Sequence, residues 1–308
     1  MSNDRRATTV FLHIPKTAGS TVRTLLSQNY RKKRTHAFSG KPQQVDWFIE
    51  QPEKFRGSFD LIHGHHTYGI HEYVPRDCVY FTFLRNPVDR FFSDYFFAFD
   101  YPEHTLHDQI VSGEMSIVDY ARLPEHEPYF DNLMTQYLVG RMFERPTSED
   151  LALAKHRLEN DIAAFGITER FDDSLLLIAQ TLGWRKPFYM NKNISPKSIR
   201  DVPDEAIEHV KPFLQKDQQL YEFACELFER RVQAEGPELA AARQSLQEIE
   251  GRIHENYDRE LHRLYSVGRR VGFKLAWANL FTGLRPIDAL LKDKVHRAVY
   301  DFIASETR

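Results

Sequence analysis

Short apolar runs alternate along this chain with segments that have helical character. The runs are rich in β-branched and aromatic residues, which favours buried strands. They lie at Thr9–His13, Phe59–Ile62, Val79–Leu84 and Ala163–Thr168. Helices are predicted to begin at Thr21, to span Val88–Phe99 and Ser174–Leu182, and to fill most of Asp204–Val232. Strands and helices that alternate in this way predict an α/β domain.

The pattern changes after Gly236-Pro237. Apolar residues from Leu239 to Leu264 recur every three or four positions, which predicts a long amphipathic helix. A second apolar block at 271–291 either packs against that helix or lies at a membrane surface. The sequence therefore predicts a domain at 1–235 and a helical extension at 236–308, where a homo-oligomer contact or a membrane contact can form.

The segment that follows the first apolar run has the composition of an anion-binding loop. It reads His13-Ile-Pro-Lys-Thr-Ala-Gly-Ser-Thr21 and leads into a predicted helix. A helix N-terminus offers unbonded N–H groups and the positive end of its dipole, and Lys16 adds a charge. The pattern is not a Walker A loop, because the lysine precedes the glycine. The alternative is a surface turn with one exposed lysine.

A second anion-binding pattern follows the run that ends at Leu84. Arg85 stands at the strand end, Pro87 suits the first turn of a helix, and Ser93 lies further along that helix. A guanidinium and a hydroxyl so placed can bind one phosphate together. Alternatively, Arg85 pairs with a nearby aspartate and Ser93 lies on the helix surface.

Together these segments resemble the sulfotransferases that use 3′-phosphoadenosine 5′-phosphosulfate (PAPS). The sequence of the first motif is similar to that of the carbohydrate-directed branch, which includes heparan sulfate 2-O-sulfotransferases and bacterial relatives. Two further stretches, Asp131–Thr135 and Phe165–Asp172, resemble the same branch, so the likeness covers about residues 8–230. It implies a P-loop-like, three-layer α/β fold with a central parallel sheet.

The resemblance also implies roles for individual residues. Lys16 would stabilise the charge that develops on the departing 5′-phosphate. Ser20 and Thr21 would hold that phosphate, with backbone donors from Thr17 and Gly19. In the second motif, Arg85 and Ser93 would bind the 3′-phosphate.

A histidine cluster at Leu61-Ile-His-Gly-His-His66 lies between the two motifs. The carbohydrate branch has a His-Gly-His segment in this order, which implies a catalytic base and a substrate contact at His63 and His65. A neutral imidazole can take the proton of a sugar hydroxyl. His63 is the first choice for the base and His65 the second. There are two rival interpretations. One is a metal site that includes Glu72. The other is a structural role, in which the histidines are hydrogen-bonded to backbone carbonyls.

These patterns predict a PAPS-dependent enzyme that sulfates a hydroxyl of a carbohydrate or glycolipid and requires no metal. The alternatives are an atypical nucleotide-dependent kinase and a non-catalytic module that binds a nucleotide or glycan. A formal net charge of −3 gives no general attraction to nucleic acid. The basic run Arg31–Arg34 is best interpreted as a solvated loop.

Cellular location is predicted from cysteine usage and from the start of the chain. Cys78 and Cys225 form no paired motif, which fits a reducing compartment. The first residues lack an apolar signal region, and no run of about 18 apolar residues occurs. Animal glycan sulfotransferases of this kind have an N-terminal membrane anchor. This chain is then either a soluble enzyme of the bacterial type or one trimmed of its anchor; Met1 favours the former, so we expect a cytoplasmic enzyme.

Overall fold

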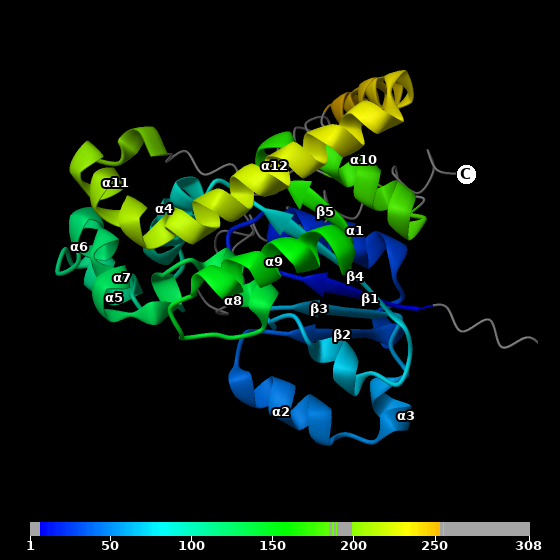
Figure 1. Ribbon diagram of the computed structural model, residues 1–308, viewed down its shortest axis with the longest axis horizontal. Helices are drawn as coiled ribbons and strands as arrows, with labels where there is room; N and C mark the ends of the chain where they lie inside the picture. The colour runs from blue at the N-terminus through cyan, green and yellow to red at the C-terminus, as the bar shows by residue number, and fades with distance from the viewer. Residues whose placement is uncertain (1–6, 185–186, 188, 190–198, 253–254, 256–308) are drawn as a thin grey trace, which may run out of the picture.

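A central parallel sheet organises the computed structural model, which describes residues 7–184, 187, 189, 199–252 and 255 (Figure 1). The strand order is β2-β3-β1-β4-β5, and each neighbouring pair is parallel. The strands are β1 Thr8–Leu12, β2 Thr35–Phe38, β3 Leu61–Gly64, β4 Cys78–Leu84 and β5 Ile162–Ile167. The predicted α/β fold with a central parallel sheet is confirmed.

Helices and 3₁₀ turns connect the strands. The helices are α1 Gly19–Asn29, α2 Pro42–Glu50, α3 Glu53–Arg56, α4 Pro87–Asp100, α5 His107–Val111, α6 Ile117–Ala121, α7 Leu123–His126, α8 Leu133–Val139, α9 Ser148–Asn160, α10 Phe171–Leu182, α11 Asp204–Val210 and α12 Gln215–Glu235. The 3₁₀ turns are η1 Lys32–Arg34, η2 Ile70–Tyr73, η3 Pro128–Phe130, η4 Thr168–Arg170, η5 Ile199–Asp201 and η6 Lys211–Leu214. Residues 237–252 are also helical.

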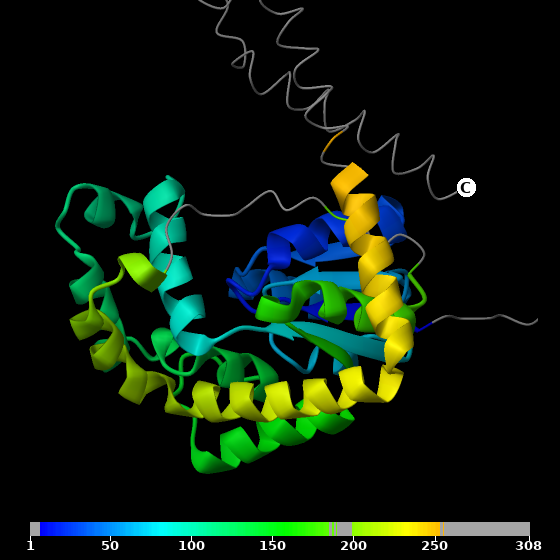
Figure 2. The same ribbon diagram turned by 90° about the horizontal axis from the view of Figure 1, so that it is seen from above.

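The alternation of side chains along β1 produces two cores, one on each face of the sheet. Phe11 points to the face that α1 and α10 cover, where it packs with Val22 and Ile178. Val10 and Leu12 point to the other face, where α8, α9 and α12 pack. Figure 2 shows these helices on opposite sides of the sheet. The domain therefore has three layers, with the sheet in the middle.

A separate group of helices stands beside the carboxyl ends of the strands. Helix α4 packs its aromatic face, including Phe91 and Phe92, against α5, α6 and α11. Asn86 caps α4 by accepting hydrogen bonds from the N–H groups of Val88 and Asp89. Figure 1 shows this group at the edge where the strands end. Helix α4 therefore forms a wall beside the edge where a parallel sheet binds its ligands.

The sequence located strands β1, β3, β4 and β5 and helices α1, α4, α10, α11 and α12 within a few residues, but it did not predict α8 and α9, which cover one face of the sheet. Helix α1 begins at Gly19, two residues before the predicted start, and His63 lies inside β3. The edge strand β2, in contrast, was not predicted. Of the extension, residues 237–252 form a helix whose Leu246 packs against Leu25 and Leu175. The rest of the predicted long helix and the block 271–291 lie outside the described residues.

Two further expectations concern cysteines and membranes. Cys78 and Cys225 are both free thiols, in agreement with the absence of a disulfide framework. In the described part of the chain, no helix is both long enough and apolar enough to cross a bilayer.

Candidate active site

Three neighbouring strands bring the predicted motifs to one edge of the sheet. Strand β1 lies between β3 and β4, with Leu12 opposite Gly64 of β3 and opposite Thr82 of β4. Because the strands are parallel, the loop after β1, the histidines around Gly64 and Arg85 after β4 emerge side by side. The separate sequence motifs therefore form one site.

The loop after β1 has an unusual backbone that presents the start of α1. Lys16 and Ala18 adopt left-handed conformations, with φ of 68° and 65°. Thr17 is fully buried, and its hydroxyl donates to the carbonyl of Ile14 at 2.8 Å. Ala18, whose methyl group cannot cap a helix, precedes α1, and the first turn contains no acidic residue. Left-handed non-glycine residues often occur at ligand sites, and this helix start suits an anion.

Gly19 is required here because the imidazole of His13 occupies the space beside it. A Cβ atom at Gly19 would lie 1.6 Å from Nε2 of His13. The His13 ring is stacked on Phe11 at 5.2 Å and on His65 at 4.2 Å between centroids. The glycine thus allows the predicted anion-binding loop and the histidine cluster to pack directly against each other.

Lys16 and Arg85 lie close together. Nη1 of Arg85 donates to the carbonyl oxygen of Lys16 at 3.2 Å. Burial lowers the pKa of Lys16 to about 8; the Asp94 carboxylate opposes this shift, whereas Arg85 and Arg90 add to it. Burial also lowers the pKa of Arg85. The site therefore concentrates positive charge that a bound polyanion would neutralise.

The predicted hydroxyl groups lie on the two helices that flank this charge. Ser20 and Thr21 are in the first turn of α1, and Ser93 lies in the second turn of α4. All three are half-buried. Their positions are compatible with the predicted phosphate contacts, which stay predictions.

The three histidines of the cluster have different surroundings. Nδ1 of His63 is buried and has no hydrogen-bond partner among the described residues, and burial lowers its pKa to about 4. Nδ1 of His65 lies 3.0 Å from the carbonyl oxygen of His13. His66 is buried, and its Nδ1 lies 3.0 Å from the carbonyl of Thr67. A carbonyl can only accept, so the Nδ1 atoms of His65 and His66 carry the proton.

The metal interpretation gains no support from the side-chain arrangement. Among the residues with a described position, no group of three or more histidine, cysteine or acidic side chains could hold a metal ion. The rival with Glu72 therefore has no complete ligand set there.

Four further residues belong to this site, although the sequence did not assign them a role. His13 supports the loop as described above. Arg90 is 2% exposed, and Asp94 is also buried and accepts a hydrogen bond from the hydroxyl of Tyr120 at 3.0 Å. The Phe97 ring lies beneath the Lys16 ammonium, 3.9 Å from Nζ to the centroid. Their sequence signal is spacing on α4: residues 90, 94 and 97 fall three or four positions apart, on one helix face.

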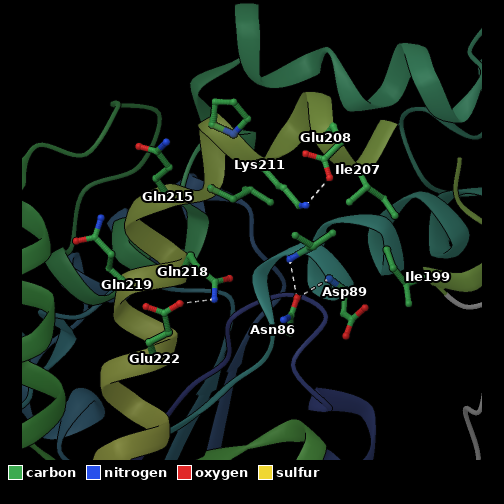
Figure 3. Close-up of a pocket in the computed structure, with 13 residues that line it drawn as sticks. Asn86, Asp89, Ile199, Ile207, Glu208, Lys211, Gln215, Gln218, Gln219 and Glu222 are labelled. Atoms are coloured by element: carbon green, nitrogen blue, oxygen red, sulfur yellow. Dashed lines mark hydrogen bonds and ion pairs between the residues drawn. The ribbon is translucent and has the colours of Figure 1, made fainter. Parts of the chain in front are cut away.

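A cavity of about 780 Å³ lies between the start of α4 and the elements α11, η6 and α12 (Figure 3). Its lining includes three carboxylates, from Asp89, Glu208 and Glu222. The lining lysine, Lys211, is bonded to Glu208. Because three carboxylates and one lysine give the lining a negative net charge, this cavity does not suit a nucleotide with several phosphates. The positive edge beside Lys16 and Arg85 is the better anion site.

Comparison with known families agrees with this arrangement. The sequence profile of the galactose-3-O-sulfotransferase family matches residues 2–256. The chain belongs to the galactose-3-O-sulfotransferase family. The predicted carbohydrate-directed sulfotransferase branch is thus confirmed, whereas the narrower resemblance to heparan sulfate 2-O-sulfotransferases is not supported. The family match also extends past the predicted domain boundary at residue 235, into the helix at 237–252.

Individual family members are distant relatives. Mouse galactose-3-O-sulfotransferase 2 is 23% identical over 78% of this chain and 66% of its own length. Mouse galactose-3-O-sulfotransferase 3 is 25% identical over 77% of this chain and 61% of its length. Pig galactose-3-O-sulfotransferase 2 is 26% identical over 78% of this chain and 68% of its own length. The chain thus spans about two thirds of the length of these relatives.

Proposed function

We propose that this protein transfers a sulfuryl group from PAPS to the 3-hydroxyl of a galactose unit in a carbohydrate. The observation that carries this proposal is the meeting of three motifs at the ends of β3, β1 and β4. The contact between Arg85 and the Lys16 carbonyl supports a single binding site for both motifs. The family and the names of its members support galactose as the acceptor sugar.

The residues at this edge fit the chemistry of the donor. The start of α1 and Lys16 would hold the 5′-phosphate, and Arg85 with Ser93 would hold the 3′-phosphate. The donor would supply the sulfuryl group. Lys16 would stabilise the negative charge that grows on the leaving oxygen. These fixed cations support a reaction that requires no metal.

The hydrogen bonds favour His65 as the base, ahead of His63. The carbonyl of His13 fixes the proton of His65 on Nδ1, which leaves the lone pair of Nε2 to accept a proton from the sugar hydroxyl. A base works best when its pKa is near the working pH. Burial lowers the pKa of both imidazoles, but at His65 the hydrogen bond to the His13 carbonyl opposes this shift, whereas the pKa of His63 falls to about 4, which makes His63 the weaker base. We assign His63 to the supporting wall of the site.

The test is transfer of labelled sulfate from PAPS to a terminal β-galactoside, with a chelator present. We expect 3-O-sulfated product from the wild type. Turnover should fall about 100-fold or more in Lys16→Ala and in His65→Ala, and less in His63→Ala. Equal losses at both histidines would contradict the assignment of the base. Nucleotide binding without transfer would instead indicate a non-catalytic module, and transfer of phosphate from ATP would indicate a kinase.

Some earlier expectations stay as proposals. They are a glycolipid acceptor, a membrane contact through residues 271–291, a homo-oligomer and a cytoplasmic location. Co-sedimentation with vesicles, light scattering during gel filtration, and fractionation of the native cells test the last three of these in turn.

A further inference from the structure

Helix α4 ends in a pair of exposed aromatic rings. Phe97 and Tyr101 are four residues apart, so they lie on the same helix face. Their rings are stacked, with 5.0 Å between centroids and 18° between planes. Phe97 is 39% exposed and Tyr101 is 41% exposed. The Tyr101 hydroxyl donates to Glu103 at 2.6 Å, which helps to hold the ring in place.

This pair lies beside the groups that we assign to the reaction. Nζ of Lys16 lies 3.9 Å from the centre of the Phe97 ring. Because Tyr101 stacks on Phe97, the aromatic pair lies beside the lysine that we assign to the donor. Exposed aromatic surface is costly in water, and at a site it commonly binds a ligand.

We propose that the Phe97 ring, backed by the stacked ring of Tyr101, forms the acceptor platform, on which the pyranose ring of a β-galactoside lies. The proposal rests on the proposed function and names the substrate contact for that same site. A neutral sugar suits the platform because its C–H groups carry slight positive charge and the face of an aromatic ring is negative. The Lys16 ammonium now lies against this negative face for the same reason.

The shape of galactose favours this contact. Its axial 4-hydroxyl leaves the hydrogens of C3, C4 and C5 together on one face of the ring. The 3-hydroxyl is equatorial, so it leaves the stacked sugar sideways and stays accessible to His65. In glucose, the 4-hydroxyl is equatorial and the C4 hydrogen points to the other face. The platform should therefore bind a galactoside better than the corresponding glucoside.

Lys16 couples the platform to the donor site. A bound 5′-phosphate would attract the ammonium away from Phe97 and so expose more of the ring. We expect methyl β-galactoside to bind more tightly when adenosine 3′,5′-bisphosphate is present. This coupling is a readout that a purely structural role of the two rings would not produce.

The experiment measures binding of methyl β-galactoside and methyl β-glucoside by ligand-observed NMR, with adenosine 3′,5′-bisphosphate present. Tyr101→Ala should weaken galactoside binding about tenfold and reduce the preference over the glucoside. Tyr101→Phe keeps the ring and should bind like the wild type. Phe99→Ala is the matched control: Phe99 is 37% exposed on the same helix, about 200° around its axis from Phe97, and its loss should change little.

The outcomes separate the two proposals. If the wild type binds the nucleotide but binds both sugars equally, or if Tyr101→Ala and Phe99→Ala behave alike, the platform is wrong and the donor site stands. If the wild type does not bind the nucleotide, the proposed function fails instead. Normal nucleotide affinity in Tyr101→Ala, together with weaker galactoside binding, would support both.

Discussion

Two buried polar clusters of this protein differ in how completely their hydrogen bonds are satisfied. The first surrounds Asp217, at the start of α12. Its carboxylate accepts hydrogen bonds from the N–H groups of Met134 and Thr135 and from the hydroxyl of Thr135, at 2.8–2.9 Å. Its own N–H donates to the side chain of Asn132 at 2.8 Å. Asp217 therefore binds the N-terminus of α8 to α12.

The second cluster lies at the carboxyl edge of the sheet, and its hydrogen bonds are incomplete. His63 Nδ1 and His66 Nε2 are buried without a hydrogen-bond partner in the part of the chain that is described. Buried polar atoms are usually bonded, because an unbonded one is costly. The Asp217 cluster therefore stabilises the fold, whereas the histidine cluster leaves costly unbonded groups at the edge of the sheet where we expect the ligands to bind.

The largest expected effect comes from breaking the satisfied cluster. Asp217→Ala leaves the N–H groups of Met134 and Thr135 and the Thr135 hydroxyl buried without their acceptor. The free energy of unfolding should fall by about 3–5 kcal/mol. Urea denaturation followed by circular dichroism measures it. The exposed Asp77→Ala is the control and should cost less than about 0.5 kcal/mol. Similar losses in both variants would mean that Asp217 is no more important than a surface aspartate.

The buried histidines should make the free energy of unfolding depend on pH. Burial lowers the pKa of His63 and of His66 from 6.5 to about 4, so the folded state favours the neutral rings. Between these values the unfolded chain binds more protons. Stability is therefore complete above about pH 6.5 and is lost as the pH falls toward 4. Between pH 7 and pH 5, the fully buried His66 should cost about 2 kcal/mol, and His63 less.

Urea denaturation at several pH values checks this dependence. His66→Gln, which cannot titrate, should flatten it, whereas the exposed His126→Gln should leave it unchanged. The interpretation is wrong if the wild type and His66→Gln lose stability in parallel.

The sequence predicted the parts of the site that depend on local pattern. Apolar runs located β1, β3 and β4, and the loop around Lys16 and the turn at Arg85 follow directly from their ends. The stretch Asp131–Thr135 looked like a family signal, and its contacts with Asp217 give it a structural role. Local pattern sufficed for the loop around Lys16 and for Arg85, because each follows a strand that the apolar residues identify.

The rest depended on contacts between distant segments. Strand β2 was missed because it is a short edge strand with only Phe38 buried. His13 and Gly19 fit together through the packing of their side chains, which spacing alone does not reveal. Arg90, Asp94 and Phe97 acquire their roles only when α4 is placed beside the loop of Lys16. The choice of His65 over His63 required a hydrogen bond to the backbone of His13, which follows β1 and is distant in sequence.

The smallest expected effect concerns the charge of Lys16, the lysine that we assign to the donor site. This pKa is about 8, because burial and the charges of Arg85 and Arg90 outweigh the attraction of Asp94. As the pH rises through 8, Lys16 loses its charge and one anion contact is lost. The affinity for adenosine 3′,5′-bisphosphate should fall about tenfold between pH 7 and pH 9.5, measured by calorimetry. Lys16→Arg keeps its charge throughout and should show a flat profile. If both proteins weaken equally, the pH dependence belongs to another group and Lys16 does not bind the nucleotide phosphate as a cation.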